Sequence, residues 1–97
     1  MIKIYALIDP TTNRIRYVGK TAQTLQKRLK EHLSPARLKK DSAKNVWLRS
    51  LKVRPVIVVL EECTKKEAEA SEIFWIRLLK MTGNDLVNST IGGNSWR

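Results

Sequence analysis

Four side chains in the first third of the chain have the chemistry to act on a phosphate ester. They are the phenols of Tyr5 and Tyr17, the guanidinium of Arg28 and the imidazole of His32. A guanidinium can form two hydrogen bonds to a phosphate and offset charge that develops during hydrolysis. An imidazole can transfer a proton or donate a hydrogen bond, whereas a phenol acts as a base only if its pKa falls well below about 10. These residue types predict a phosphate-handling site, although strand tyrosines and a lone histidine are also ordinary packing residues.

Glu72 is an acidic residue within an apolar stripe. On a helix its nearest neighbours are Ala68, Trp75, Ile76 and Leu79. A carboxylate in apolar surroundings is costly unless a cation pairs with it. The cation can be an arginine at the edge of the core, or it can be a metal ion, because a carboxylate oxygen suits a Mg²⁺ ion that keeps most of its waters. The position of Glu72 leaves both interpretations open.

The spacing of apolar residues predicts the elements that must position these side chains. The patterns indicate strands over 2–8 and 14–18, a helix over 24–33, a short helix over 46–51, a buried central strand over 56–60, and a helix from 64 to about 81. The last helix starts with capping-box spacing. The order β-β-α-α-β-α predicts an α+β fold, a small three-stranded antiparallel sheet flanked by helices, in one domain spanning residues 1–97.

Positive charge is concentrated in the front half of the chain. The formal net charge is +10, with fourteen basic and three acidic residues over 1–54 but five and six over 55–97. This asymmetry predicts one cationic face, as binding to a polyanion requires. A solubilising surface and an anionic membrane surface are the alternatives to nucleic acid.

Several protein classes do not fit the sequence. The longest apolar run, Pro55 to Leu60, is too short to span a bilayer, and Met1 to Asp9 lacks the length and cleavage region of a signal peptide. Cys63 is the only cysteine, so an intrachain disulfide is excluded. These features predict an intracellular protein that is not embedded in a membrane.

Short motifs recur in a fixed order along the chain, and together they resemble the GIY-YIG nuclease domain. The motifs are Lys3-Ile4-Tyr5, then Tyr17-Val18-Gly19 followed by Lys20-Thr21, then Arg28-x-x-x-His32, then Glu72 before Phe74-Trp75-Ile76, and Asn88 ahead of Gly92-Gly93. Two positions depart from the family's pattern, because Lys3 replaces the glycine of the first motif and Val18 replaces the isoleucine of the second. The tyrosines are retained.

The resemblance implies a metal-dependent DNA endonuclease, or the catalytic module of one, that leaves 5′-phosphate and 3′-hydroxyl ends. It implies Mg²⁺ held by Glu72, with Mn²⁺ as a substitute, and either tyrosine as the base for an attacking water. The implied catalytic residues are Tyr5, Tyr17, Arg28, His32, Glu72 and Asn88, and the implied phosphate-binding residues are Gly19, Lys20, Lys27 and Arg28.

The partners implied by the resemblance are DNA and either an additional DNA-recognition domain or a second copy of the chain. Family members usually couple this domain to a separate DNA-recognition domain, and cutting both strands would need a homodimer or two successive events. The alternative hypothesis is a non-catalytic nucleic-acid-binding domain that uses the same basic face, because phosphate contacts serve binding and catalysis equally.

Overall fold

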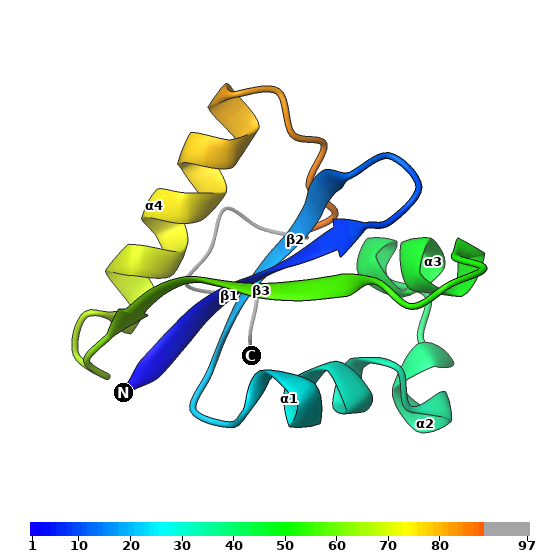
Figure 1. Cartoon of the computed structure of the whole chain (residues 1–97), viewed down its shortest axis with the longest axis horizontal. Helices are drawn as coiled ribbons and strands as arrows, with labels where there is room; N and C mark the ends of the chain where they lie inside the picture. The colour runs from blue at the N-terminus through cyan, green and yellow to red at the C-terminus, as the bar shows by residue number, and fades with distance from the viewer. Residues whose placement is uncertain (89–97) are drawn as a thin grey trace.

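In the computed structural model, which describes residues 1–88, three strands cross at the centre and helices lie on both sides of them (Figure 1). The elements are β1 (Ile2–Asp9), β2 (Arg14–Thr21), α1 (Leu25–His32), α2 (Pro35–Leu38), α3 (Ala43–Ser50), β3 (Val56–Cys63) and α4 (Ala68–Met81). The predicted α+β class and three-stranded antiparallel sheet are confirmed. The order contains one element more than predicted, because residues 35–38 form a turn of helix instead of a plain connection. Proline is favoured at the first position of a helix, which explains why Pro35 starts α2 as well as following α1.

The strands are ordered β2-β1-β3, so β1 is the central strand. Residues 56–60 do form part of a strand, but the prediction that this strand is the buried central one is wrong. Val56 and Val59 are 46% and 40% exposed, as expected for an edge strand that is packed on one side only. A run of β-branched residues indicates a strand but cannot show how many neighbours the strand will have.

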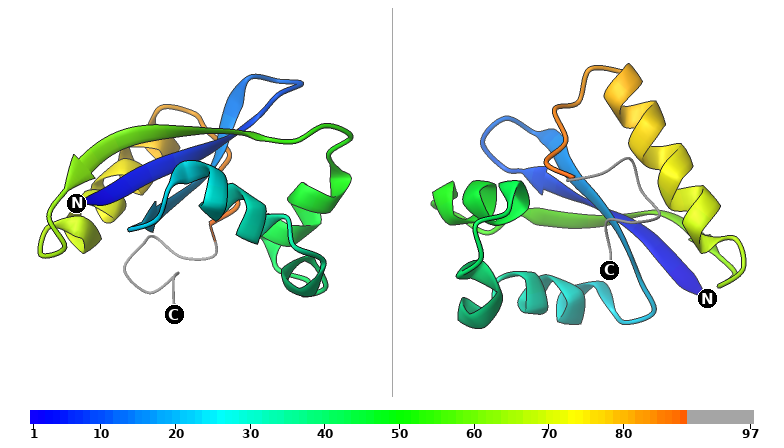
Figure 2. Two further views of the ribbon diagram at one scale, coloured as in Figure 1. Left: turned by 60° about the horizontal axis from the view of Figure 1, so that its bottom comes forward. Right: turned by 180° about the vertical axis from the view of Figure 1, so that it is seen from behind.

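Alternate residues of β1 pack against different helices, because successive side chains of a strand point to opposite faces. One core cluster joins the sheet to α4 and contains Ile4, Val18, Cys63, Ala68, Ile76 and Leu79. The other joins the sheet to α1 and α3 and contains Tyr5, Leu7, Leu29, Trp47 and Leu48. Both further views likewise show α4 across the strands from α1 and α3 (Figure 2). The central strand is thus covered from both sides.

Local hydrogen bonds set the limits of the hairpin and of α4. In the hairpin loop, the Asp9 carboxylate accepts from the Thr11 amide at 2.8 Å, and Asn13 adopts a positive φ of 60° that asparagine tolerates. Ahead of α4 the predicted capping box forms, since the Thr64 amide donates to Glu67 Oε1 and the Glu67 amide donates to Thr64 Oγ1. The box stands one turn before the assigned start of α4 at residue 68, and the helix ends at residue 81 as predicted.

The segment after α4 returns to the free edge of β2. There the Val87 amide donates to the Arg16 carbonyl at 2.6 Å. The Gly92-Gly93 pair of the last motif lies outside the described residues. Within residues 1–88, no helix is both long enough and apolar enough to cross a membrane.

Candidate active site

The antiparallel register of β1 and β2 places Tyr5 opposite Gly19. The Tyr5 ring lies directly against the backbone of Gly19, where a Cβ atom would meet Tyr5 Oη and would approach Cζ to 2.6 Å. No side chain larger than hydrogen fits at position 19 unless the phenol moves. The glycine of the second motif therefore has a structural reason, which is to let the phenol cross the neighbouring strand.

Helix α1 brings a guanidinium and an imidazole to the same phenol. Arg28 and His32 are one helical turn apart and share a face. Tyr5 Oη lies 2.6 Å from His32 Nε2 and 3.1 Å from Arg28 Nε. Tyr5 and His32 are both 0% exposed, whereas the Arg28 side chain is 22% exposed. The structure thus joins three predicted site residues in one hydrogen-bonded group.

Tyr17 completes a cluster of three rings. It pairs with Leu7, so it is a diagonal rather than a direct cross-strand neighbour of Tyr5. Its ring centroid lies 6.4 Å from that of Tyr5 and 5.5 Å from that of His32, and the contact with His32 is edge-on. Tyr17 retains partial exposure, unlike Tyr5. The two phenols therefore share one site but differ in their access to solvent.

Lys44 is a member of the site that the sequence did not single out. Its Nζ lies 3.1 Å from His32 Nδ1 and 5.4 Å from the centroid of the Tyr17 ring. It belongs to a lysine-rich stretch that shows no pattern, so no sequence signal separated it from Lys39 and Lys40. Its role follows only from the tertiary structure, which brings the start of α3 to His32 on α1.

Burial raises the pKa of both phenols. For Tyr5 the first cause is loss of hydration, followed by repulsion from Tyr17, and these outweigh the favourable charge of Arg28. For Tyr17 burial again raises the pKa, while Arg28 opposes the rise. In the protein without substrate or metal, both tyrosines are therefore protonated at neutral pH. A role as base requires more positive charge near the phenol than Arg28 alone supplies.

Burial and nearby cations keep His32 neutral. Its pKa is lowered to about 3, first by burial and then by the charges of Lys44, Arg28 and Arg37. The pKa of Lys44 is lowered to about 8, by burial and then by Arg28 and Arg37. At neutral pH the pair consists of an uncharged imidazole and a charged ammonium group. His32 is thus a poor proton acceptor in this site.

Glu72 is 1% exposed and lies on the inner face of α4. Its Oε1 is 4.0 Å from Lys20 Nζ, so a lysine of β2 is one cation that pairs with it. The negative charge of Glu72 contributes to raising the pKa of Tyr5 and of Tyr17, which places it within electrostatic reach of both phenols. The carboxylate therefore borders the same site from the α4 side.

The donor chemistry around Glu72 fits a weakly held magnesium ion. Within residues 1–88, no group of three or more His, Cys, Asp and Glu side chains could enclose a metal. Mg²⁺ does not need such a group, because it keeps several waters and binds through one or two carboxylates together with substrate phosphates. One buried carboxylate beside a cationic surface meets that requirement, whereas zinc would need more protein ligands.

Asn88 serves the backbone of β2. Its Oδ1 accepts from the Val18 amide at 3.1 Å and its Nδ2 donates to the Val18 carbonyl at 2.8 Å, with the residue 8% exposed. Val18 lies between Tyr17 and Gly19, so this pair of bonds holds the strand that carries both. In the structure, Asn88 therefore supports the strand that carries the site residues.

Two lysines that the sequence singled out remain, one on α1 and one on β1. Lys27 is exposed on α1, beside Arg28 in sequence. Arg28 also binds Glu31, whose Oε1 is 3.1 Å from Nη1. Lys3, which replaces the glycine of the first motif, donates to the Gln23 carbonyl at 3.5 Å. Its side chain thus supports the chain between β2 and α1.

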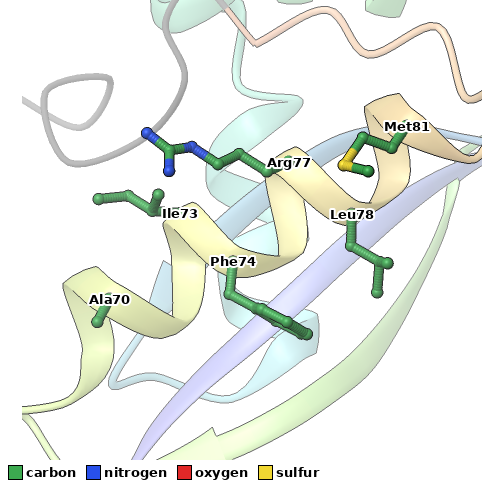
Figure 3. A pocket seen from close by; sticks show the side chains of 6 residues that line it. All are labelled: Ala70, Ile73, Phe74, Arg77, Leu78 and Met81. Atoms are coloured by element: carbon green, nitrogen blue, oxygen red, sulfur yellow. The ribbon is translucent and has the colours of Figure 1, made fainter.

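A separate apolar hollow lies on the outer face of α4. Figure 3 shows the side chains that line it, which are those of Ala70, Ile73, Phe74, Arg77, Leu78 and Met81. None of the predicted site residues lines it. It differs from the group around Tyr5 in having no titratable residue except an arginine.

Residues 1–85 match the family described as the GIY-YIG catalytic domain. This chain belongs to the GIY-YIG family. Membership implies nuclease activity and a nucleic-acid substrate. The matched range covers the two tyrosine motifs, α1 and Glu72 of this GIY-YIG domain, and it ends before Asn88. No curated protein and no solved structure matches the chain significantly.

Proposed function

We propose that this GIY-YIG domain is a Mg²⁺-dependent DNA endonuclease that leaves 5′-phosphate and 3′-hydroxyl ends. The observation that carries the proposal is the convergence of Arg28 Nε and His32 Nε2 on Tyr5 Oη, at 3.1 and 2.6 Å. Packing alone does not require a guanidinium and an imidazole to meet on one buried phenol. A site that must organise a phosphate and a water does require them.

Glu72 is the residue that would hold the metal ion. When bound, Mg²⁺ would supply positive charge to the scissile phosphate and offset the Glu72 charge that raises the pKa of both phenols. Lys20, whose Nζ lies 4.0 Å from Glu72 Oε1, would contact the phosphate from the same side. The carboxylate and the lysine thus form the α4-facing side of the proposed site.

The two tyrosines would have different tasks. Tyr17 is partly exposed, so an attacking water can reach its phenol, and Arg28 opposes the rise in pKa that burial causes. Tyr5 is fully buried and holds Arg28 and His32 in place. We therefore assign the base role to Tyr17 and an orienting role to Tyr5.

Arg28 would stabilise the charge of the transition state. Its hydrogen bonds to Tyr5 and Glu31 use two of the five N–H groups of a guanidinium. The others would bind phosphate oxygens, and the exposed Lys27 would bind a neighbouring phosphate. The partners of Arg28 fix its orientation before substrate arrives, which reduces the cost of ordering it.

A plasmid-nicking assay with Mg²⁺ tests the proposal. We expect the wild type to nick supercoiled DNA, and Glu72→Ala and Arg28→Ala to lose at least about 100-fold in rate while still binding DNA. Glu69→Ala, which removes an exposed acid from the same helix, should cut like the wild type. A wild type that cuts nothing with Mg²⁺ or Mn²⁺, or two mutants that cut as fast as it does, would refute the endonuclease assignment.

The concentration of basic residues in 1–54 favours one other function, a nucleic-acid-binding domain without catalysis. The same variants separate the two. A pure binding domain has no use for a buried acid near a polyanion, so Glu72→Ala would leave binding unchanged or stronger, and the wild type would not cut.

A further inference from the structure

The His32 ring is held between two partners whose chemistry differs. One nitrogen, Nε2, lies 2.6 Å from Tyr5 Oη, and the other, Nδ1, lies 3.1 Å from Lys44 Nζ. The ring is 0% exposed. A neutral imidazole carries one proton, so one of these two nitrogens donates and the other accepts.

The ammonium group of Lys44 decides between the two tautomers. A charged lysine has three donors and no lone pair, so it can only donate to Nδ1. The single imidazole proton must then be on Nε2, where it points at Tyr5 Oη. A doubly protonated ring would set a second donor against the ammonium group, and the lowered pKa of His32 already excludes that form at neutral pH.

We infer that Lys44 is a positioning residue that fixes His32 as its Nε2–H tautomer and so directs a hydrogen-bond donor onto Tyr5 Oη. Tyr5 Oη then accepts from both His32 Nε2–H and Arg28 Nε–H. With both lone pairs engaged, Tyr5 Oη holds both side chains of α1 as an acceptor, and its own O–H is directed away from His32. With the opposite tautomer, Nε2 would accept the Tyr5 proton, and Tyr5 Oη would no longer accept a hydrogen bond from His32.

The position of Lys44 is set by the start of α3. Ser42 caps the helix by accepting from the Asn45 amide at 3.1 Å. The Asn45 side chain, 5% exposed, donates to the carbonyls of Arg37 and Lys40 at 2.8 and 3.0 Å. These bonds fix the chain before α3, and the contact with the Tyr17 ring adds a cation–π attraction. The ammonium group is therefore part of an ordered structure.

The tautomer can be observed directly because His32 is the only histidine in the chain. Long-range ¹H–¹⁵N NMR near neutral pH should show an unprotonated, pyridine-type Nδ1 and a protonated, pyrrole-type Nε2 in the wild type. Lys44→Met keeps the stem but removes the donor, and should shift the signals toward the Nδ1–H tautomer. Lys44→Arg is also donor-only and should keep the wild-type pattern, as should Lys40→Met at an exposed position of the same segment.

Either a wild-type spectrum with Nδ1 protonated, or a Lys44→Met spectrum identical to the wild type in a folded variant, would overturn the inference. Its consequence for cleavage rests on the proposed function. There we expect Lys44→Met to lower kcat by about 10- to 100-fold with little change in KM, and Lys44→Arg to restore most of it. If the wild type shows the predicted tautomer but cuts no DNA, the proposed function fails and the assignment of the tautomer stands.

Discussion

At the scale of single residues, the site is a chain of hydrogen bonds that runs from Lys44 through His32 to Tyr5 and on to Arg28. Such networks are costly when one member is missing, because a buried polar group is then left without its partner. His32 is the sensitive member, since it is fully buried and surrounded by cations. Protonating it would place a further positive charge among Arg28, Arg37 and Lys44.

This arrangement predicts that His32 makes folding stability fall in acid. The unfolded chain binds a proton on His32 below pH 6.5, whereas the folded protein binds it only near 3. Between these values the unfolded state holds one proton more, so stability decreases as pH falls, by up to about 1.4 kcal/mol per pH unit. We expect urea unfolding to show a steeper loss over this range for the wild type than for His32→Gln, which keeps a donor for Tyr5. Parallel pH curves for the two proteins would contradict the lowered pKa.

Sequence reasoning found the residues of this network only where a motif marked them. Tyr5, Arg28 and His32 could be predicted because they carry family motifs at fixed spacing. Lys44 could not, because its contact with His32 depends on how the chain brings the start of α3 to α1, and neighbouring lysines look the same in the sequence. The role of Asn88 was also out of reach, because its partner Val18 is 70 residues away.

At the scale of elements, the site depends on the edge strand β2. This strand carries Tyr17, Gly19 and Lys20, and only one of its edges pairs with β1. The other edge is held by Asn88, which binds both backbone groups of Val18, and by the Val87 amide on Arg16. The side-chain amide of Asn88 thus makes the two backbone hydrogen bonds that a further strand would otherwise make.

The elements show which parts of a fold a local pattern can predict. The hairpin, α1 and α4 follow from alternation, leucine spacing and capping residues, all of which are local. Local patterns could not predict that residues 56–63 lie at an edge, because that depends on the pairing of strands far apart in sequence. They also left α2 undefined, since four residues are too few to show a helical period.

The hold of Asn88 on β2 gives a prediction at this scale. Asn88→Ala should leave the amide and carbonyl of Val18 without partners and lower the free energy of unfolding by about 1–3 kcal/mol. Hydrogen exchange of the Val18 amide should accelerate more than that of Ala6, which is on the central strand. Asn84→Ala, which removes a different loop asparagine that binds the Leu79 carbonyl, is the matched control. Equal protection of Val18 in all three proteins would show that Asn88 does not hold β2.

At the scale of the whole molecule, the part of the chain that carries most of the positive charge also supplies most of the site residues. Residues 1–54 contain fourteen basic and three acidic side chains. They form β1, β2 and α1 to α3, which supply the tyrosines, Arg28, His32 and Lys44. The near-neutral remainder contributes β3 and α4 with Glu72. The acid that would hold a metal thus comes from the part of the chain with little positive charge, and it meets the basic part at Lys20.

This division predicts how DNA binding responds to salt. Each phosphate contact made by a lysine or arginine contributes about 0.9 to the slope of log K against log salt concentration. Lys27→Ala, on exposed α1, should lower that slope by about one, whereas Lys66→Ala, exposed in the turn before α4, should leave it unchanged. Fluorescence anisotropy of a labelled duplex over a range of salt concentrations measures both, with Glu72→Ala as the background to prevent cleavage. Because both variants remove one positive charge, equal slopes would mean that DNA responds to the net charge of the molecule and not to the face formed by residues 1–54.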